Sequence, residues 1–141
     1  MRQRMDVARE AILSAGSLLH ETFGREIGGE VEEKDRNDFV TETDRQSEKL
    51  IVGTLLRAFP DIPVLAEETA KRPVGSTWWV IDPLDGTTNF IHGYPQIGCS
   101  IALVADGKIA FGLVYDPLRE ELFEARAGEG ALCNDLSLIH I

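Results

Sequence analysis

The pattern of apolar and polar positions divides the chain into a helical first part and a strand-rich second part. Apolar residues recur at three- and four-residue spacing from Asp6 to Phe23, which predicts an amphipathic helix. A second periodic stretch predicts a helix that begins near Thr43, where Thr43 and Gln46 have capping-box spacing, and ends before Pro60. The polar, glycine-rich residues 26–37 between them are expected to form an exposed loop or a poorly formed hairpin. We expect the two helices to pack as a pair.

Short apolar runs bounded by turn residues predict strands in the second part. Asp106-Gly107 is a dipeptide typical of a tight hairpin, and Asp116-Pro117 marks a further turn. We therefore expect an antiparallel meander behind the helical pair, which makes the fold class α+β. The predicted strands are Pro63 to Ala66, Trp78 to Ile81, Cys99 to Val104, Ile109 to Tyr115 and Glu121 to Ala125.

Composition and charge restrict the class of ligand. A hydrophobic content of 43% is sufficient for a packed core, and the formal net charge is -10 without any cluster of Lys and Arg. This charge argues against direct binding of nucleic acid, and a phosphate ester would be repelled unless bound cations reversed the local charge. Cys99 and Cys133 fit neither a zinc spacing nor a disulfide framework, so both are expected to be reduced and partly buried.

No apolar run has the length of a membrane span, and the N-terminus lacks the apolar segment of a signal peptide. We therefore expect a soluble, cytoplasmic protein.

The most informative segment follows the apolar strand that ends at Ile81. Asp82 and Asp85 lie three residues apart, with the Leu84 carbonyl between them. These hard oxygen ligands suit magnesium, manganese or calcium rather than zinc. Gly86-Thr87-Thr88 then begins a short helix or helix-like turn, whose N–H groups can bind an anion. The alternative is a plain Asp-Gly turn, but an apolar strand before Asp-Pro-x-Asp-Gly-Thr-Thr is much more specific than Asp-Gly alone.

Two further acidic segments have both structural and functional interpretations. Glu67-Glu68 ends a predicted strand, where adjacent side chains point to opposite faces, so one at most joins Asp82 on a given side. The alternative is a solvated loop with two acids. Asp44 is interpreted either as an acid in the first turn of a helix or as a site residue, and Asp38 as a turn residue or part of the same motif.

Taken together, three motifs resemble the inositol monophosphatase family in their order and spacing. They are Asp38 to Asp44 (DFVTETD), Glu67-Glu68, and Asp82 to Phe90 (DPLDGTTNF). Gly112 to Pro117 and Gly128 to Asn134 also match, so the similarity runs from about Asp6 to Asp135. Ala66 replaces a glycine that many members have before the Glu pair, which affects local backbone freedom only. The resemblance implies a layered α/β/α/β/α sandwich, of which this chain supplies the N-terminal helix pair and the larger antiparallel sheet.

The resemblance also implies a set of site residues, all of them built around Mg²⁺. Glu67, Asp82 and the Leu84 carbonyl would bind a first ion, Asp82 and Asp85 would share a second, and Glu67 would help to hold a weaker third. The remaining roles are implied in the same way. Asp44 and Thr87, together with Glu67, would orient and deprotonate the attacking water. The N–H groups of Gly86 and Thr87 would bind phosphate oxygens, and Glu68 would support the metal ligands from behind.

The implied activity is Mg²⁺-dependent hydrolysis of a small phosphate monoester, most simply inositol monophosphate. Related branches act on fructose 1,6-bisphosphate, histidinol phosphate or 3′-phosphoadenosine phosphate, and one bacterial branch also associates with transcription or ribosome-assembly machinery. The continuation Asn89 to Gly93 resembles the inositol branch, and His92 is expected to be a surface residue rather than a general acid. The complete protein is expected to be a homodimer.

The family completes its second metal site with an Asp from a later segment. We therefore expect residues 1–135 to be an N-terminal metal-binding domain that has little or no activity by itself. Residues 136–141, LSLIHI, resemble the translation of a transposon-end adapter, which indicates a non-native tail; a genuine short strand is the alternative.

Overall fold

The computed structural model describes residues 1–25, 33–67 and 73–138. Three helices and seven strands account for most of these residues. The helices are α1 (Arg2–Thr22), α2 (Glu33–Ala58) and α3 (Thr87–Ile91). The strands are β1 (Val64–Leu65), β2 (Thr77–Asp85), β3 (Gly98–Ala105), β4 (Lys108–Asp116), β5 (Glu121–Arg126), β6 (Gly130–Cys133) and β7 (Leu136–Ser137).

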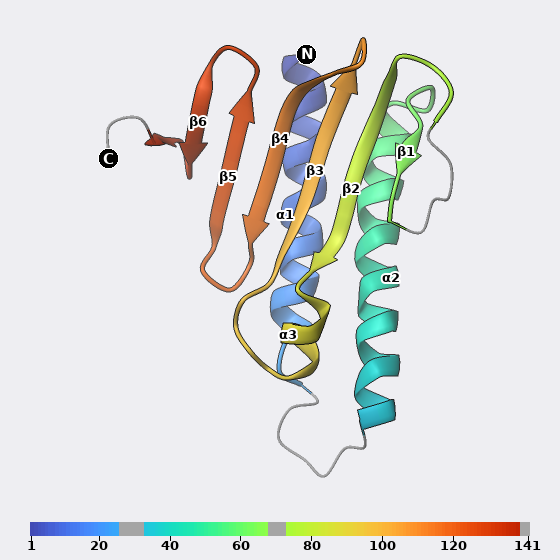
Figure 1. Cartoon of the computed structure of the whole chain (residues 1–141), viewed down its shortest axis with the longest axis vertical. Helices are drawn as coiled ribbons and strands as arrows, with labels where there is room; N and C mark the ends of the chain where they lie inside the picture. The colour runs from blue at the N-terminus through green and yellow to red at the C-terminus, as the bar shows by residue number, and fades with distance from the viewer. Residues whose placement is uncertain (26–32, 68–72, 139–141) are drawn as a thin grey trace.

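The two long helices lie side by side and cover one face of a single sheet (Figure 1). The strands follow one another in chain order, from β1 at one edge to β7 at the other. Every neighbouring pair from β2 to β7 is antiparallel, whereas β1 runs parallel to β2. The α+β class and the helix pair are thus confirmed, and the sheet is mixed rather than purely antiparallel because the chain crosses over between β1 and β2.

Helix α2 begins earlier than the sequence pattern predicts. Thr43 lies well inside the helix, and its Oγ1 donates to the carbonyl of Phe39 at 2.9 Å, so the capping-box interpretation of Thr43 and Gln46 is wrong. For the same reason Asp44 is not an acid of the first turn. Residues 33–37, expected to be part of a loop, are also helical, while 26–32 lie outside the described residues. A threonine hydroxyl that bonds the carbonyl four residues back is compatible with a helix interior, which is why the capping signal was misleading.

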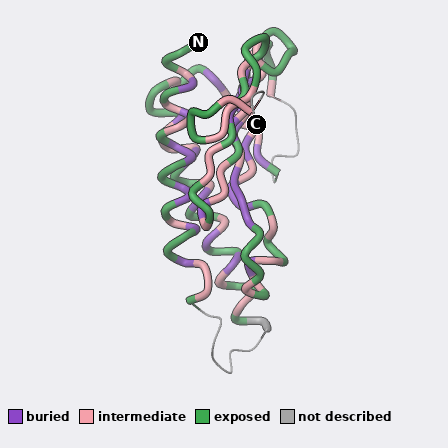
Figure 2. The backbone as a smooth tube through the Cα atoms, turned by 90° about the vertical axis from the view of Figure 1, so that its left-hand side faces the viewer, coloured by how far each residue is buried: buried purple, intermediate pink, exposed green. Residues whose placement is uncertain are grey.

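The core lies between the helix pair and the sheet, as the burial pattern along the backbone shows (Figure 2). Trp79 of β2 is fully buried and packs between the rings of Phe59 and Phe111, at centroid distances of 6.2 and 5.9 Å. Further along the strand order, the buried carboxylate of Glu124 on β5 pairs with Arg9 of α1, with 2.7 Å between Arg9 Nε and Glu124 Oε2. The sheet and the helices are therefore held together by apolar packing and by the Arg9–Glu124 ion pair.

Left-handed backbone conformations mark two tight turns. Asp106 and Gly107 have φ angles of 51° and 75°, which confirms the predicted hairpin between β3 and β4. Asn134 and Asp135, with φ angles of 49° and 67°, form a similar turn between β6 and β7, two strands that the hydrophobic pattern did not predict. Residues 136–137 pair with β6, but an unrelated segment can also pair with an open edge, so the foreign origin of residues 136–141 stays a prediction.

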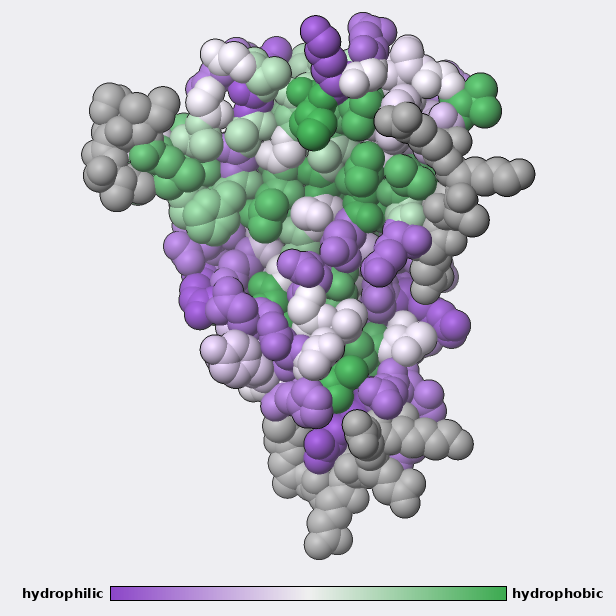
Figure 3. Space-filling view, in the orientation of Figure 1, coloured by the Kyte–Doolittle hydropathy of each residue, from purple (hydrophilic) through white to green (hydrophobic). Residues whose placement is uncertain are grey.

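The face of the sheet opposite the helices carries apolar side chains. Figure 3 shows a hydrophobic band across this face. Val114 and Phe123, which are cross-strand partners on β4 and β5, are 51% and 37% exposed. None of the helices in the described parts of the chain is long and apolar enough to cross a membrane.

Candidate metal centre

The parallel pairing of β1 with β2 brings two predicted ligands together. Leu65 is the register partner of Val80. Glu67 follows Leu65 by two residues, and its charge acts on Asp82, so the parallel pairing leaves these two carboxylates close to each other. Glu67 lies in the turn after β1 and is exposed, while Asp82 is half-buried. The carboxyl ends of both strands thus present an acidic side chain at one edge of the sheet.

A bulge in β2 changes the direction of the next acid. Asp82 pairs with Ser100 and Asp85 with Gly98, so three steps along β2 correspond to two steps along β3. Without the extra residue, side chains three positions apart would point to opposite faces of the sheet. The bulge therefore turns Asp85 toward the face that Asp82 occupies. Pro83, which has no N–H to donate to a ladder, lies within this irregular segment.

The electrostatics of Asp82 show that the three carboxylates interact. Burial raises the pKa of Asp82 above its ordinary value, and the charges of Asp85 and Glu67 raise it further. The Leu84 N–H, which donates to Asp82 Oδ1 at 3.3 Å, opposes this increase. A divalent cation bound beside Asp82 would favour its charged form, and so would oppose the effects of burial and of the neighbouring carboxylates on this pKa.

Helix α2 closes the site from another side. Asp44 and Glu48, one helical turn apart, line a pocket of about 230 Å³ together with Glu67, Ala66 and Pro83. Both acids also line an adjacent pocket of about 340 Å³, and Thr87 of α3 borders this second pocket. Asp44 therefore borders one pocket with Glu67 and another with Thr87.

Gly86 connects the acidic turn to α3. It is the N-cap residue of the helix, with φ 85° and ψ 40°, a left-handed conformation that favours glycine. A Cβ atom on Gly86 would lie 2.7 Å from the carbonyl oxygen of Gln96, so the close packing also requires glycine. The first helical hydrogen bond runs from the Phe90 N–H to the Gly86 carbonyl, which leaves the preceding N–H groups without a partner inside α3.

Residues 1–140 match the family model described as "Inositol monophosphatase family". The chain belongs to the inositol monophosphatase family.

Relatives within this family are known from bacteria and plants. The chain is 39% identical over 140 residues to the Nus factor SuhB of Pasteurella multocida, and 40% identical over 144 residues to inositol monophosphatase 2 of Solanum lycopersicum. Each alignment covers 98% of this chain but only 52% and 54% of the two relatives. The chain therefore spans about half the length of the curated relatives that it matches.

Solved structures of inositol monophosphatase family proteins share the fold described above. Inositol monophosphatase-II of Staphylococcus aureus superposes with a TM-score of 0.84 at 31% identity, covering 98% of this chain and 52% of that one. The extragenic suppressor protein suhB of Bartonella henselae gives a TM-score of 0.81 at 38% identity, with 94% of this chain and 52% of that chain covered.

Among the predicted site residues of this family member, the structure brings most together and leaves one undescribed. Glu67 and Asp85 are close enough to Asp82 to raise its pKa, whereas Glu68 lies outside the described residues. In the described part of the chain, no three His, Cys, Asp or Glu side chains converge tightly enough to form a metal cluster by themselves. The assigned roles therefore stay predictions.

Sequence reasoning missed two residues of α2 that belong to this region. Glu48 borders both pockets, and Ser47 donates a hydrogen bond to the Pro83 carbonyl at 2.7 Å. Their spacing of three and four residues after Asp44 was the available signal, since such positions share one face of a helix.

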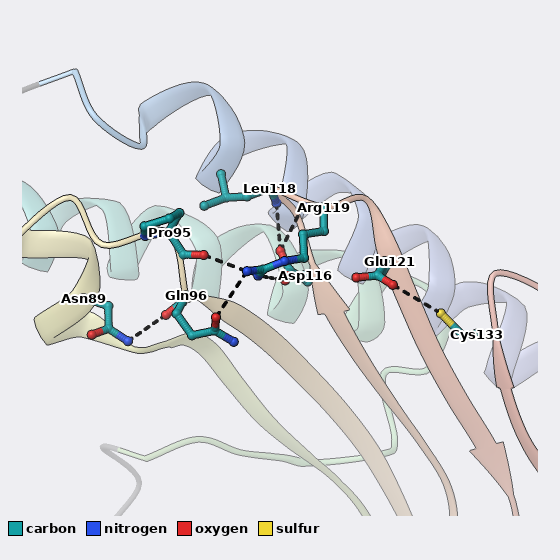
Figure 4. A network of polar contacts seen from close by, with 8 residues as sticks. All are labelled: Asn89, Pro95, Gln96, Asp116, Leu118, Arg119, Glu121 and Cys133. Carbon is teal, nitrogen blue, oxygen red and sulfur yellow. Dashed lines mark hydrogen bonds and ion pairs between the residues drawn. The ribbon is translucent and has the colours of Figure 1, made fainter. Parts of the chain in front are cut away.

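A polar network supports the segment that packs against Gly86 (Figure 4). The Asn89 side chain donates to the Gln96 carbonyl at 2.8 Å, and Arg119 Nη2 donates to the Gln96 side chain at 3.4 Å. Arg119 is held in turn by Asp116, at 2.7 Å from Nη1 to Oδ2. The β4–β5 turn thus contacts the side chain of Gln96, while Asn89 holds the carbonyl that Gly86 approaches.

Three other polar side chains do not join the site. His92 follows α3 and is exposed. Cys99 and Cys133 are free thiols, buried and half-buried, and burial together with the charge of Asp82 raises the pKa of Cys99 to about 12. A thiol with so high a pKa is not a nucleophile at neutral pH.

Proposed function

We propose that this chain is the N-terminal half of a Mg²⁺-dependent phosphatase that hydrolyses a small phosphate monoester, inositol monophosphate being the first candidate. Family membership supports the class of reaction. The observation that carries the proposal is that acids from three separate segments, α2, the turn after β1 and the end of β2, border one region beside the first turn of α3. The complete protein would contain, after this chain, the second half that its relatives have.

The donor set fits magnesium by its chemistry. Glu67, Asp82 and Asp85 supply carboxylate oxygens, and Leu84 supplies a backbone carbonyl, which are the ligands that Mg²⁺ prefers. When bound, the ions would lower the pKa of the attacking water and neutralise charge that develops on the phosphate. The chain's own acids provide the negative charge that retains them, which resolves the conflict between a net charge of -10 and an anionic substrate.

Asp44 and Thr87 are proposed to act on the nucleophile. The Thr87 hydroxyl accepts a hydrogen bond from the water and donates one to the Asp44 carboxylate, which serves as the final proton acceptor. Their common position at one pocket supports this pairing. Glu67 helps to orient the same water, and the N–H groups of Gly86 and Thr87 hold the phosphate oxygens at the start of α3.

The substrate is proposed from relatives. Structures of the Staphylococcus aureus enzyme exist with inositol monophosphate bound and with 2′-AMP bound, at 32% identity each to this chain. The residues that choose the sugar, and the Asp that completes the second metal site, are assigned to the half beyond residue 141. The present 141 residues alone should therefore bind Mg²⁺ weakly and turn over little substrate.

Phosphate release measured on a panel of sugar and nucleotide monophosphates, with and without Mg²⁺, tests the proposal on the complete protein. Asp85→Asn should lose activity by at least two orders of magnitude, whereas Asp61→Asn, an exposed acid in the turn before β1, should retain it. Full activity of the Asp85→Asn variant, or of the complete protein in excess chelator, would refute the metal-dependent mechanism.

A second candidate is a partner-binding role in transcription or ribosome assembly. It is favoured by the name of several relatives, Nus factor SuhB, at 37–41% identity. A cellular phenotype that Asp85→Asn rescues as well as the wild type would indicate this role, because the substitution removes catalysis but leaves the surface otherwise intact. Homodimer formation and cytoplasmic location of the complete protein stay predictions, to be checked by sedimentation velocity and cell fractionation.

A further inference from the structure

Ser47 makes an unusual contact for a serine in the middle of a helix. Its side chain is fully buried, and its Oγ donates to the Pro83 carbonyl at 2.7 Å, across 36 positions of sequence. Other hydroxyl residues of α2 behave differently. Thr43 and Thr54 bond the carbonyls of Phe39 and Leu50, four residues back in their own helix. The Ser47 hydroxyl is instead directed at the acidic turn of β2.

The carbonyl that Ser47 holds belongs to the bulge. The regular ladder between β2 and β3 is interrupted between Asp82 and Asp85, and Pro83 is buried within that interruption. A buried carbonyl outside a ladder needs a hydrogen-bond partner from elsewhere. Ser47 supplies this partner from α2.

The same peptide unit also contacts the candidate metal ligand. The Pro83 carbonyl and the Leu84 N–H are the two ends of one planar trans peptide group, so they point in opposite directions. One end accepts from Ser47 at 2.7 Å, and the other donates to Asp82 Oδ1 at 3.3 Å. Fixing the carbonyl therefore fixes the direction of the N–H that orients the Asp82 carboxylate.

We propose that Ser47 is a positioning residue for the metal centre. It acts through the Pro83–Leu84 peptide group, whose N–H aims the Asp82 carboxylate. This inference rests on the proposed function, since it assumes that Asp82 and Leu84 bind Mg²⁺. It assigns to α2 a role beyond Asp44: the helix that supplies the proposed proton acceptor also sets the geometry of the metal-binding turn.

Calorimetric titration of the complete protein with Mg²⁺ tests the inference. Ser47→Ala should weaken the tightest Mg²⁺ site about tenfold, as loss of a group that orients a ligand typically does. Ser47→Cys, which keeps the side-chain shape with a larger terminal atom and donates only weakly, should fall between alanine and the wild type. Thr54→Ala is the matched control, because it removes a hydroxyl from the same helix without touching the turn, and its Mg²⁺ affinity should equal that of the wild type.

Two further measurements separate positioning from plain stability. Phosphate release by Ser47→Ala should need a higher Mg²⁺ concentration for half-maximal rate, yet recover most of its kcat at saturating Mg²⁺. A variant that melts at a lower temperature but binds Mg²⁺ as tightly as the wild type would show a purely structural serine and overturn the inference. A wild type that binds no Mg²⁺ at all would instead overturn the proposed function, so the two failures are distinguishable.

Discussion

A single added methyl group at Gly86 is expected to disturb the geometry of the candidate site strongly. Gly86 has φ 85°, and the Cβ atom of an alanine would lie 2.7 Å from the Gln96 carbonyl oxygen and 3.4 Å from Asn89 Nδ2. The Gln96 carbonyl cannot retreat easily, because it accepts a hydrogen bond from Asn89 at 2.8 Å. Gly86→Ala must therefore move the backbone that joins Asp85 to Thr87.

Two costs add in this variant. A non-glycine residue in the left-handed region costs roughly 1–2 kcal/mol. Forcing a methyl group into a contact that is too short costs about another 1–3 kcal/mol. We thus expect Gly86→Ala to destabilise the protein by roughly 2–5 kcal/mol, and to lower phosphatase activity because the Thr87 N–H is displaced from the phosphate.

Gly128→Ala is the matched control for this experiment. Gly128 has a φ angle of 80°, but a Cβ atom there would meet nothing within 4 Å, so it experiences the conformational cost alone. Thermal melting of both variants in the complete protein should show Gly86→Ala lower than Gly128→Ala by roughly 2–10 °C. Equal melting temperatures would refute the argument that the contact with Gln96 matters, and full activity in Gly86→Ala would refute the assignment of the turn to the phosphate.

Three other predictions follow from the described contacts. The raised pKa of Asp82 means that its charge destabilises the metal-free fold at neutral pH. Asp82→Asn should therefore raise the melting temperature without metal, and should abolish the rise in melting temperature that Mg²⁺ causes. A lower melting temperature of the variant without metal would contradict this. Burial alone would raise the pKa of Asp116, but the hydrogen bonds from Arg119 and from backbone N–H groups lower it. The charged Asp116 carboxylate therefore stabilises the fold at pH values above its pKa in the unfolded chain, and this stabilisation is lost as the pH falls through its pKa in the folded protein. Arg119→Gln should make that loss begin at a higher pH, as an NMR titration of the Asp116 carboxyl would show. Leu103→Ala, at a fully buried position of β3, should cost about 2–5 kcal/mol in a urea unfolding experiment, and a cost below ~1 kcal/mol would contradict the described core.

The hairpins and the amphipathic helix could be predicted because their signals are local. The Asp106-Gly107 dipeptide alone predicts its turn, and the apolar positions of α1 recur at helical spacing within one continuous segment. The start of α2 could not be predicted, because Thr43 satisfies its hydroxyl inside the helix and nothing in the sequence distinguishes this from a cap. The strand β6 was missed as well: it is four residues long and half-exposed, too short to show an alternating pattern.

Candidate residues for the site could be chosen from the sequence, but the backbone that arranges them could not be predicted. The sequence predicts Asp82 and Asp85 as ligands of one site, but it does not show the bulge in β2 that brings side chains three positions apart toward the same face. Glu67 meets Asp82 through a parallel register between segments that are joined by a crossover, which no local pattern reveals. The spacing of Ser47 after Asp44 was the available signal, but a buried serine on a helix is most simply a neutral core residue, so the spacing alone did not identify it.

These observations suggest that the backbone, rather than the carboxylates, holds the candidate centre together. Burial and the charges of Asp85 and Glu67 both disfavour the charged form of Asp82, so other contacts must keep these acids together. The parallel register of β1 and β2, the bulge at Pro83, the bond from Ser47 and the left-handed Gly86 all act on the main chain. A cation that binds the folded state neutralises these charges. Its binding therefore stabilises the folded state, by an amount that grows with the logarithm of the cation concentration. It follows that changes to the backbone supports should weaken metal binding even where every carboxylate remains in place.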